Sequence, residues 1–247
     1  MPRAVLRLKT IRGNTSKYMD YPDFEKHIGV SFKNKALLLQ AFTHRSYLNE
    51  NKRNSLEHNE RLEFLGDAVL ELVITVFLFN KYPDKPEGEL TSYRAAVVNA
   101  TTLSNVAKSL LMEPLLRLSH GESKDTGKAR QIILANTIEA FIGAVFLDQG
   151  YGTVEKFILK HIASLLEKIV EKGAWIDAKS YFQEQAQEQV GITPAYRVVR
   201  ENGPDHDKKF IIGVYLRDEK VAEGEGKSKQ EAEQMAAEAG LKAKKWK

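Results

Sequence analysis

The chain contains no cysteine, which excludes disulfide bonds and thiolate metal sites and is typical of a reducing compartment. It also lacks an uninterrupted apolar run of the about 20 residues that a membrane-spanning helix needs. The nearest approach, Ala68–Phe79, is interrupted by Glu71 and is better interpreted as a core helix. No secretory signal is apparent. We therefore expect a cytoplasmic protein with no membrane partner.

A strong net charge is absent as well, since 37 basic and 33 acidic residues leave only +4. The basic residues are unevenly placed: residues 1–17 hold five and no acidic residue, and residues 242–247 hold four lysines. We interpret residues 1–17 as a solvated basic arm that also contacts a phosphate backbone. An organelle-targeting segment is the alternative interpretation of this arm.

Helical periodicity dominates from Tyr21 to about Glu171, where no alternation of apolar and polar residues predicts a strand. The expected helices include residues 35–42, 60–81, 86–100, 103–111 and 132–147. After Gly173 the pattern changes to helix, three strands and helix, at residues 177–190, 194–200, 210–216, 220–224 and 228–245. The predicted fold class is an all-α domain followed by an α+β domain. The predicted boundaries are an arm at 1–17, domains at 18–172 and 177–247, and a linker at 173–176.

The most informative segment is Asn59–Leu70, which reads NERLEFLGDAVL. In a helix, Glu60, Glu63 and Asp67 lie at i, i+3 and i+7, so their carboxylates share one face. Apolar residues fill most of the other positions, which predicts a largely buried helix. Burying several like charges is costly unless a cation neutralises them, and oxygen ligands suit Mg²⁺. A solvated acidic stripe remains the alternative.

This segment resembles the signature of the ribonuclease III family of endonucleases, which cut double-stranded RNA. The resemblance implies an all-α catalytic domain, a dependence on Mg²⁺ with Mn²⁺ as substitute, and no small-molecule cofactor. It also implies 5′-phosphate and 3′-hydroxyl products with a two-nucleotide 3′ overhang. The expected substrates are ribosomal RNA precursors and some messenger RNAs.

A second acidic element, ANTIEAFIGA at residues 135–144, places Asn136 and Glu139 on one face of an apolar helix. Its small residues permit close approach of a neighbouring helix. Taken alone, both side chains are better explained by bonds to neighbouring side chains. The segment resembles the family's second metal-binding motif, which implies that Glu63, Asn136 and Glu139 bind the metal and that Asp67 orients water beside it. Asp67 and Glu139 are the candidate catalytic residues.

The chain departs from the family at Asn136, where most members have Asp. An amide oxygen still ligates magnesium but brings no charge, so we expect an active enzyme with a raised magnesium requirement. Glu60 and Glu87 are possible accessory residues. Glu87 is equally explained as a first-turn glutamate stabilised by the helix dipole. His44 and His58 are interpreted as packing or capping residues.

One signature implies one site, so a cut through both strands requires a homodimer. Phe64, Leu65, Phe42 and Tyr47 are candidates for its apolar interface, although core packing is the default interpretation of each.

Residues 177–247 resemble a double-stranded-RNA-binding domain, a module that reads duplex shape across two minor grooves and the phosphates between them. The resemblance implies minor-groove contacts by Gln183 and Glu184 and by Pro204 and His206. It also implies phosphate contacts by Lys227, Ser228 and Lys229 at a helix N-terminus. These residues include 13 basic and 13 acidic side chains, so only local clustering, not net charge, predicts RNA binding.

Two other functions remain open at this stage. A non-catalytic binder of double-stranded RNA with the same fold is favoured by Asn136 alone. A helical metal-storage protein or hydrolase unrelated to RNA leaves the second domain unexplained.

Overall fold

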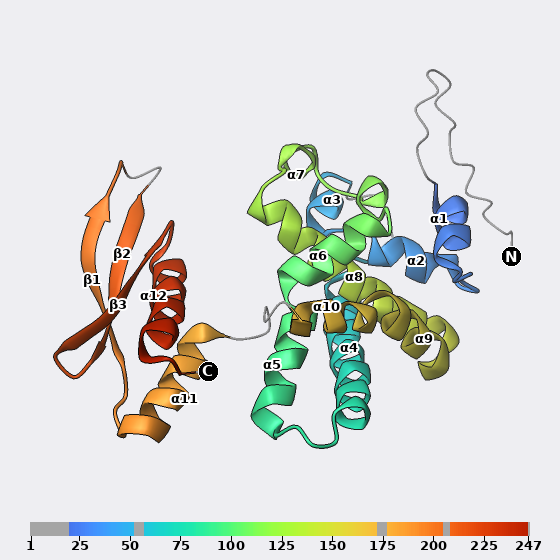
Figure 1. The fold of residues 1–247 in the computed structure, drawn as a ribbon. Helices are drawn as coiled ribbons and strands as arrows, with labels where there is room; N and C mark the ends of the chain where they lie inside the picture. The colour runs from blue at the N-terminus through green and yellow to red at the C-terminus, as the bar shows by residue number, and fades with distance from the viewer. Residues whose placement is uncertain (1–19, 52–56, 172–176, 205–207, 247) are drawn as a thin grey trace, which may run out of the picture. The chain divides into compact units, whose positions relative to one another are not determined.

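The computed structural model describes residues 20–51, 57–171, 177–204 and 208–246 (Figure 1). The chain forms two compact units. One comprises the residues up to Lys85 together with Val97–Leu166, and the other comprises Pro86–Ala96 together with Glu167–Lys247. The basic arm predicted at residues 1–17 and the linker predicted at residues 173–176 lie outside the described residues. The predicted domain boundaries therefore stay predictions.

Helices account for nearly all regular structure between residues 21 and 171, which confirms the predicted all-α class. In chain order they are α1 (Tyr21–Ile28), α2 (Lys35–Ala41), α3 (Arg45–Glu50), α4 (Glu60–Lys81), α5 (Glu87–Val98), α6 (Ala100–Ser109), η1 (Glu113–Leu115), α7 (His120–Lys124), α8 (Lys128–Gln149), α9 (Tyr151–His161), η2 (Ala163–Leu165) and α10 (Leu166–Glu171). The described residues of this stretch add one isolated bridge, between Thr43 and Arg117.

Helix boundaries differ from the predicted ones where polar side chains cap the backbone. The helix predicted to continue to residue 100 ends at Val98, because Asn99 is extended and its side chain accepts a hydrogen bond from the Thr102 N–H at 2.9 Å. The sequence analysis missed α3, whose six residues are too few to show a periodicity. His44 caps α3 by accepting the Ser46 N–H at 3.3 Å, in agreement with its interpretation as a capping residue.

Aromatic rings fill the centre of the first unit. The Phe42 ring lies 5.3 Å from that of Phe24 and 6.4 Å from that of Phe141, measured between centroids, and all three side chains are fully buried. Edge-on packing of this kind adds to the stabilisation from apolar burial. The core accounts for the whole surface of Phe42, which confirms core packing, the default interpretation of this residue, and removes it from the interface candidates.

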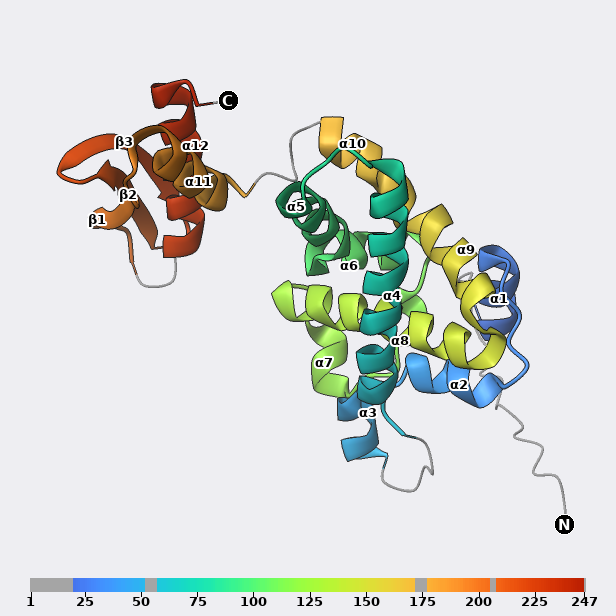
Figure 2. The ribbon, with the colours of Figure 1, turned by 90° about the horizontal axis from the view of Figure 1, so that it is seen from below.

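Helix α8 passes through this core (Figure 2). Among the described helices it is the one long and apolar enough to cross a membrane by length and composition, and 61% of its most apolar segment is buried inside the protein. Ile138, Phe141 and Ile142 have no exposed surface. Packing within the protein core explains the apolar character of α8.

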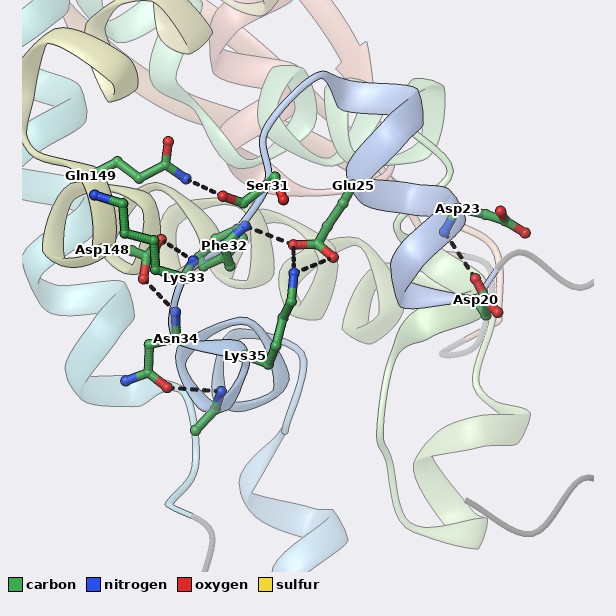
Figure 3. A network of polar contacts seen from close by, with 11 residues as sticks. Asp20, Asp23, Glu25, Ser31, Phe32, Lys33, Asn34, Lys35, Asp148 and Gln149 are labelled. Atoms are coloured by element: carbon green, nitrogen blue, oxygen red, sulfur yellow. Dashed lines mark hydrogen bonds and ion pairs between the residues drawn. The ribbon is translucent and has the colours of Figure 1, made fainter. Parts of the chain in front are cut away.

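The C-terminal end of α8 anchors the turn between α1 and α2 (Figure 3). The Asp148 carboxylate accepts hydrogen bonds from the backbone N–H groups of Lys33 and Asn34, both at 2.8 Å. Buried Glu25 of α1 accepts bonds from the Phe32 N–H of this turn at 2.7 Å and from the Lys35 ammonium at 2.6 Å. These contacts satisfy otherwise free donors at the start of α2 and fix its position against α8.

The C-terminal residues form α11 (Ala178–Val190), β1 (Ala195–Asn202), β2 (Lys209–Leu216), β3 (Glu219–Gly226) and α12 (Lys229–Lys244), which confirms the predicted order. The strands pair antiparallel in the order β1-β2-β3. Phe182 of α11, Val214 of β2 and Leu241 of α12 meet in one apolar core, so both helices cover the same face of the sheet (Figure 1).

Two glycines of β3 let α12 lie directly on the strand. A Cβ atom at Gly224 would lie 2.1 Å from the Ala236 nitrogen, and one at Gly226 would lie 2.5 Å from the Ala232 nitrogen. The glycine-rich run before α12 therefore serves packing, whereas the sequence indicated only a turn that approaches phosphate.

Candidate active site and RNA-binding surface

The acidic helix α4 begins at a buried asparagine. Asn59 is 2% exposed, and its side-chain amide donates a hydrogen bond to the Ala41 carbonyl at 3.2 Å. Its backbone N–H donates to the Thr43 carbonyl at 3.0 Å. Because these bonds fix the first turn of α4 against the end of α2, they also fix where Glu60 and Glu63 project.

Helices α4 and α8 cross at unusually short range, at two glycines. A Cβ atom at Gly66 would lie 1.7 Å from the Glu139 carbonyl oxygen, and one at Gly143 would lie 2.2 Å from the Leu62 carbonyl oxygen. Real side chains essentially never approach so closely, so only glycine permits this crossing. The crossing brings the acidic segment of α4 against residues 136–143 of α8.

The four predicted metal-site residues meet beside this crossing. The Asn136 amide donates a hydrogen bond to the Glu63 carboxylate. Glu63, Asn136 and Glu139 are partly buried and Asp67 is exposed. The charges of Asp67 and Glu63 both act on Glu139. The structure therefore brings together four oxygen-bearing side chains from segments about 70 residues apart in the chain.

Burial and mutual repulsion disfavour negative charge in this cluster. Burial, followed by the charges of Asp67 and Glu63, raises the pKa of Glu139 to about 8. Burial also raises the pKa of Glu63, and the charges of Glu60 and Asp67 add to the effect. The Asn136 hydrogen bond opposes that increase. An ionised cluster therefore needs a cation to be stable.

Oxygen donors of this kind suit a hard divalent cation such as Mg²⁺. In the described part of the chain, no group of three or more His, Cys, Asp or Glu side chains could hold a metal ion by itself. Asn136 adds an amide oxygen to the oxygen donors at this point, although its amide hydrogen now faces Glu63.

Glu60 lies at the edge of the cluster between the side chains of Arg45 and His58. One of its oxygens is 3.8 Å from the Arg45 guanidinium and the other is 3.7 Å from His58 Nδ1. These contacts hold Glu60 in place near Glu63 without drawing it into the α4–α8 crossing. Glu87 is in the other compact unit, where its carboxylate accepts a hydrogen bond from the Thr91 hydroxyl at 3.2 Å.

The predicted minor-groove residues of α11 share one exposed face. Gln183 and Glu184 line a shallow groove of about 590 Å³ together with Ser180, Gln187 and Glu188. Pro204 is exposed, two residues after the end of β1. His206 lies outside the described residues, so its predicted contact with RNA stays a prediction.

The start of α12 carries the predicted phosphate-binding residues in a capped, exposed turn. The Ser228 hydroxyl accepts the Glu231 N–H at 3.2 Å, and the Glu231 carboxylate accepts the Lys227 N–H at 2.8 Å. This reciprocal capping fixes the first turn of α12. Lys227 and Lys229 are exposed, so both reach solvent from this turn.

Sequence reasoning missed Gly66 and Glu201. Gly143 was among the small residues expected to permit close approach of a neighbouring helix, but the matching role of Gly66 on α4 was not recognised. Glu201 follows a run of β-forming residues and lies 2.9 Å from the Lys208 ammonium and 3.7 Å from that of Lys229. Nothing in the sequence joins Glu201 to a lysine 28 positions later.

Comparisons with known proteins agree with both parts of the fold. Residues 34–166 match the ribonuclease-III-like family, and residues 178–244 match the double-stranded RNA binding motif. The chain is 44% identical over 223 residues to Ribonuclease 3 of Oceanobacillus iheyensis, which covers 90% of this chain and 97% of that protein. It is 41% identical over 220 residues to Ribonuclease 3 of Borreliella burgdorferi, covering 89% of each.

Among solved structures, the nuclease domain of ribonuclease III from Campylobacter jejuni superposes with a TM-score of 0.52 at 38% identity. The match covers 57% of this chain and 94% of that domain. Three observations indicate the same family: the helical fold, the paired acidic segments, and the similarity over nearly the full length to two proteins named Ribonuclease 3. The chain therefore belongs to the ribonuclease III family and is an endoribonuclease specific for double-stranded RNA.

Proposed function

We propose that the chain hydrolyses RNA phosphodiester bonds at the α4–α8 crossing with the help of Mg²⁺, for which Mn²⁺ is a substitute. The observation that carries this assignment is the glycine contact that brings Glu63 and Asp67 of α4 beside Asn136 and Glu139 of α8. Several acidic groups partly buried at one point have no packing role. Their repulsion is relieved by a divalent cation.

The residues divide by exposure and position. Glu63, Asn136 and Glu139, all partly buried, are the proposed metal ligands. Asp67 is exposed and acts on Glu139, so it is placed to orient a water molecule beside the ion and accept its proton. When bound, the metal polarises the phosphoryl oxygen and lowers the pKa of its water. Glu60, held by Arg45 and His58, borders the substrate path as an accessory residue.

Cleavage in this way leaves a 5′-phosphate and a 3′-hydroxyl. We assign α11, the residues after β1 and the start of α12 to duplex recognition, through Gln183, Glu184, Pro204, Lys227, Ser228 and Lys229. Ribosomal RNA precursors and some messenger RNAs are the proposed substrates. The lack of cysteine supports a cytoplasmic location.

A homodimer supplies the second site that a double-strand cut with a two-nucleotide 3′ overhang requires. Helix α4 carries an exposed apolar surface, defined here as Phe64, Leu72, Val76 and Phe79. Phe64 is 82% exposed and Phe79 71%. An exposed apolar surface of this kind is typical of a site of protein–protein contact. The nuclease domain of ribonuclease III from Campylobacter jejuni has a region involved in dimer formation, which supports a homodimer here.

The decisive experiment replaces Glu139 by Gln in the full chain. The variant should lose cleavage of a labelled RNA duplex in Mg²⁺ while still binding the duplex, because the RNA-binding domain is untouched. Glu71→Gln is the matched control. Glu71 lies on α4 one turn after Asp67 and outside the cluster, and its replacement removes the same charge. Retained cleavage by Glu139→Gln would remove the metal assignment.

A second candidate function, binding of double-stranded RNA without cleavage, rests on Asn136 alone. The same cleavage assay on the unaltered chain decides it. No product at any Mg²⁺ concentration, with duplex binding intact, would establish the chain as a binder. Recovery of cleavage in Asn136→Asp would then identify the missing charge as the cause.

A further inference from the structure

A carboxylate lies among the lysines of the RNA-binding domain. Glu201, near the end of β1, approaches the Lys208 ammonium at 2.9 Å and the Lys229 ammonium at 3.7 Å. Phe210, its partner across the β1–β2 ladder, lies beneath both lysines, whose nitrogens are 6.0 and 5.7 Å from the ring centroid. One glutamate thus gathers two ammonium groups from different segments over one aromatic ring.

The two ion pairs differ in strength. The Lys208 contact has hydrogen-bond length, and Lys208 and Glu201 have similar side-chain exposures of 36% and 35%. The Lys229 contact is longer, and the Lys229 side chain is 59% exposed. Exposed ion pairs of this length contribute little to stability and are readily exchanged. Lys229 is therefore the partner that an incoming anion takes away, while Lys208 stays with Glu201.

An RNA phosphate and the Glu201 carboxylate carry the same sign and compete for Lys229. The first turn of α12 already favours a phosphate, because its N–H groups and dipole attract negative charge. A carboxylate beside that turn opposes the attraction. In water, a unit charge about 6 Å away changes a binding constant about three-fold.

We propose that Glu201 is an affinity-setting residue of the RNA-binding domain, which pairs with Lys229 in the free protein and releases it to an RNA phosphate on binding. The proposal rests on the proposed phosphate contact at the start of α12. Glu201 makes each binding event weaker than the lysines alone would allow. Weaker binding favours release of the cut duplex and so benefits an enzyme that must turn over.

The test measures binding of the full chain to an RNA duplex by fluorescence anisotropy, with the metal chelated to prevent cleavage. Glu201→Gln should tighten binding about three-fold at low salt, and the gain should shrink as the salt concentration rises. Glu219→Gln is the matched control, because Glu219 pairs with Lys244 at 2.8 Å and its replacement changes the net charge equally. That control should leave the affinity nearly unchanged.

The mechanism is tested by repeating Glu201→Gln in a Lys229→Met background, where the gain should disappear. Unchanged or weaker binding by Glu201→Gln overturns the proposal, as does a gain that persists without Lys229 or that Glu219→Gln reproduces. If Lys229→Met alone leaves the affinity unaltered, Lys229 does not contact a phosphate, and both that proposed contact and the role of Glu201 are refuted. If Lys229→Met weakens binding and Glu201→Gln has no effect, only the role of Glu201 is refuted.

Discussion

The contact between α4 and α8 makes Gly143→Ala a sharp probe of the active site. A Cβ atom at this position would lie 2.2 Å from the Leu62 carbonyl oxygen and 3.1 Å from the Gly66 nitrogen. Both neighbours are backbone atoms of a helix, so neither can turn aside as a side chain does. Restoring an ordinary contact distance requires the helices to separate by about 1 Å.

Separation of the helices has a cost in stability and a larger one in catalysis. Overpacking of this kind costs about 1–3 kcal/mol, and the helix preference of alanine over glycine returns about 1 kcal/mol. The expected net loss of about 0–2 kcal/mol lowers the melting temperature by at most several degrees. Because Leu62 precedes Glu63 and Gly143 is one turn from Glu139, the same movement separates the proposed ligands. A misplacement of about 1 Å reduces cleavage about 100-fold.

The assay is single-turnover cleavage of a labelled RNA duplex in saturating Mg²⁺, with melting measured by calorimetry on the same samples. Gly152→Ala is the control, since Gly152 also lies in a helix, α9, and a Cβ atom there meets nothing within 4 Å. That variant should keep full activity and melt no lower than the original chain. If Gly143→Ala also cleaved and melted normally, the close crossing would not position the site.

Three further predictions concern charge, capping and assembly. Asn136→Asp should lower the melting temperature without metal, because it replaces a hydrogen-bond donor to Glu63 with a repelling charge. It should also enlarge the rise in melting temperature that Mg²⁺ causes. An unchanged Mg²⁺ response in differential scanning fluorimetry would contradict this. Asp148→Ala should lose about 1–2 kcal/mol in urea unfolding at neutral pH. Burial raises the pKa of Asp148, but the Asn34 and Lys33 N–H groups lower it more, so its pKa in the folded protein lies below 3.8. The stabilisation should therefore fade as the pH falls through that region. A stability difference that persists in acid would count against the contact. Phe64→Glu should yield a monomer in light scattering, whereas an intact dimer would place the interface elsewhere.

The convergence of Glu63, Asp67, Asn136 and Glu139 was predictable because helical spacing and resemblance to a known motif indicated the same residues. Periodicity tells which side chains share a face of one helix, and here that sufficed for each half of the site. It does not tell which helix lies opposite. The register of α4 on α8 depends on Gly66 and Gly143, and their effect is visible only when the facing backbone is known.

Burial explains the other differences between prediction and structure. Phe42, directly after α2, and Phe64 of α4 are the same residue type, and both were candidates for a dimer interface. One is enclosed by Phe24 and Phe141 and the other is 82% exposed. A sequence records that a side chain is apolar but not whether the protein already covers it. Burial therefore leaves Phe64 as an interface candidate and assigns Phe42 to the core.

The neutral charge of residues 177–247 shows how a domain binds RNA without a net positive charge. Lys209 on β2 lies 2.9 Å from Glu225 on β3, and Lys220 lies 2.5 Å from Glu223 on the same strand. Because each lysine is paired with a glutamate, both contribute little to the electrostatic field at long range. Lys229 has the looser pairing, 3.7 Å from Glu201. Attraction of a phosphate depends on cations that can leave their partners, not on the sum of charges. Duplex binding by this domain should accordingly follow the variants at Glu201 and Lys229.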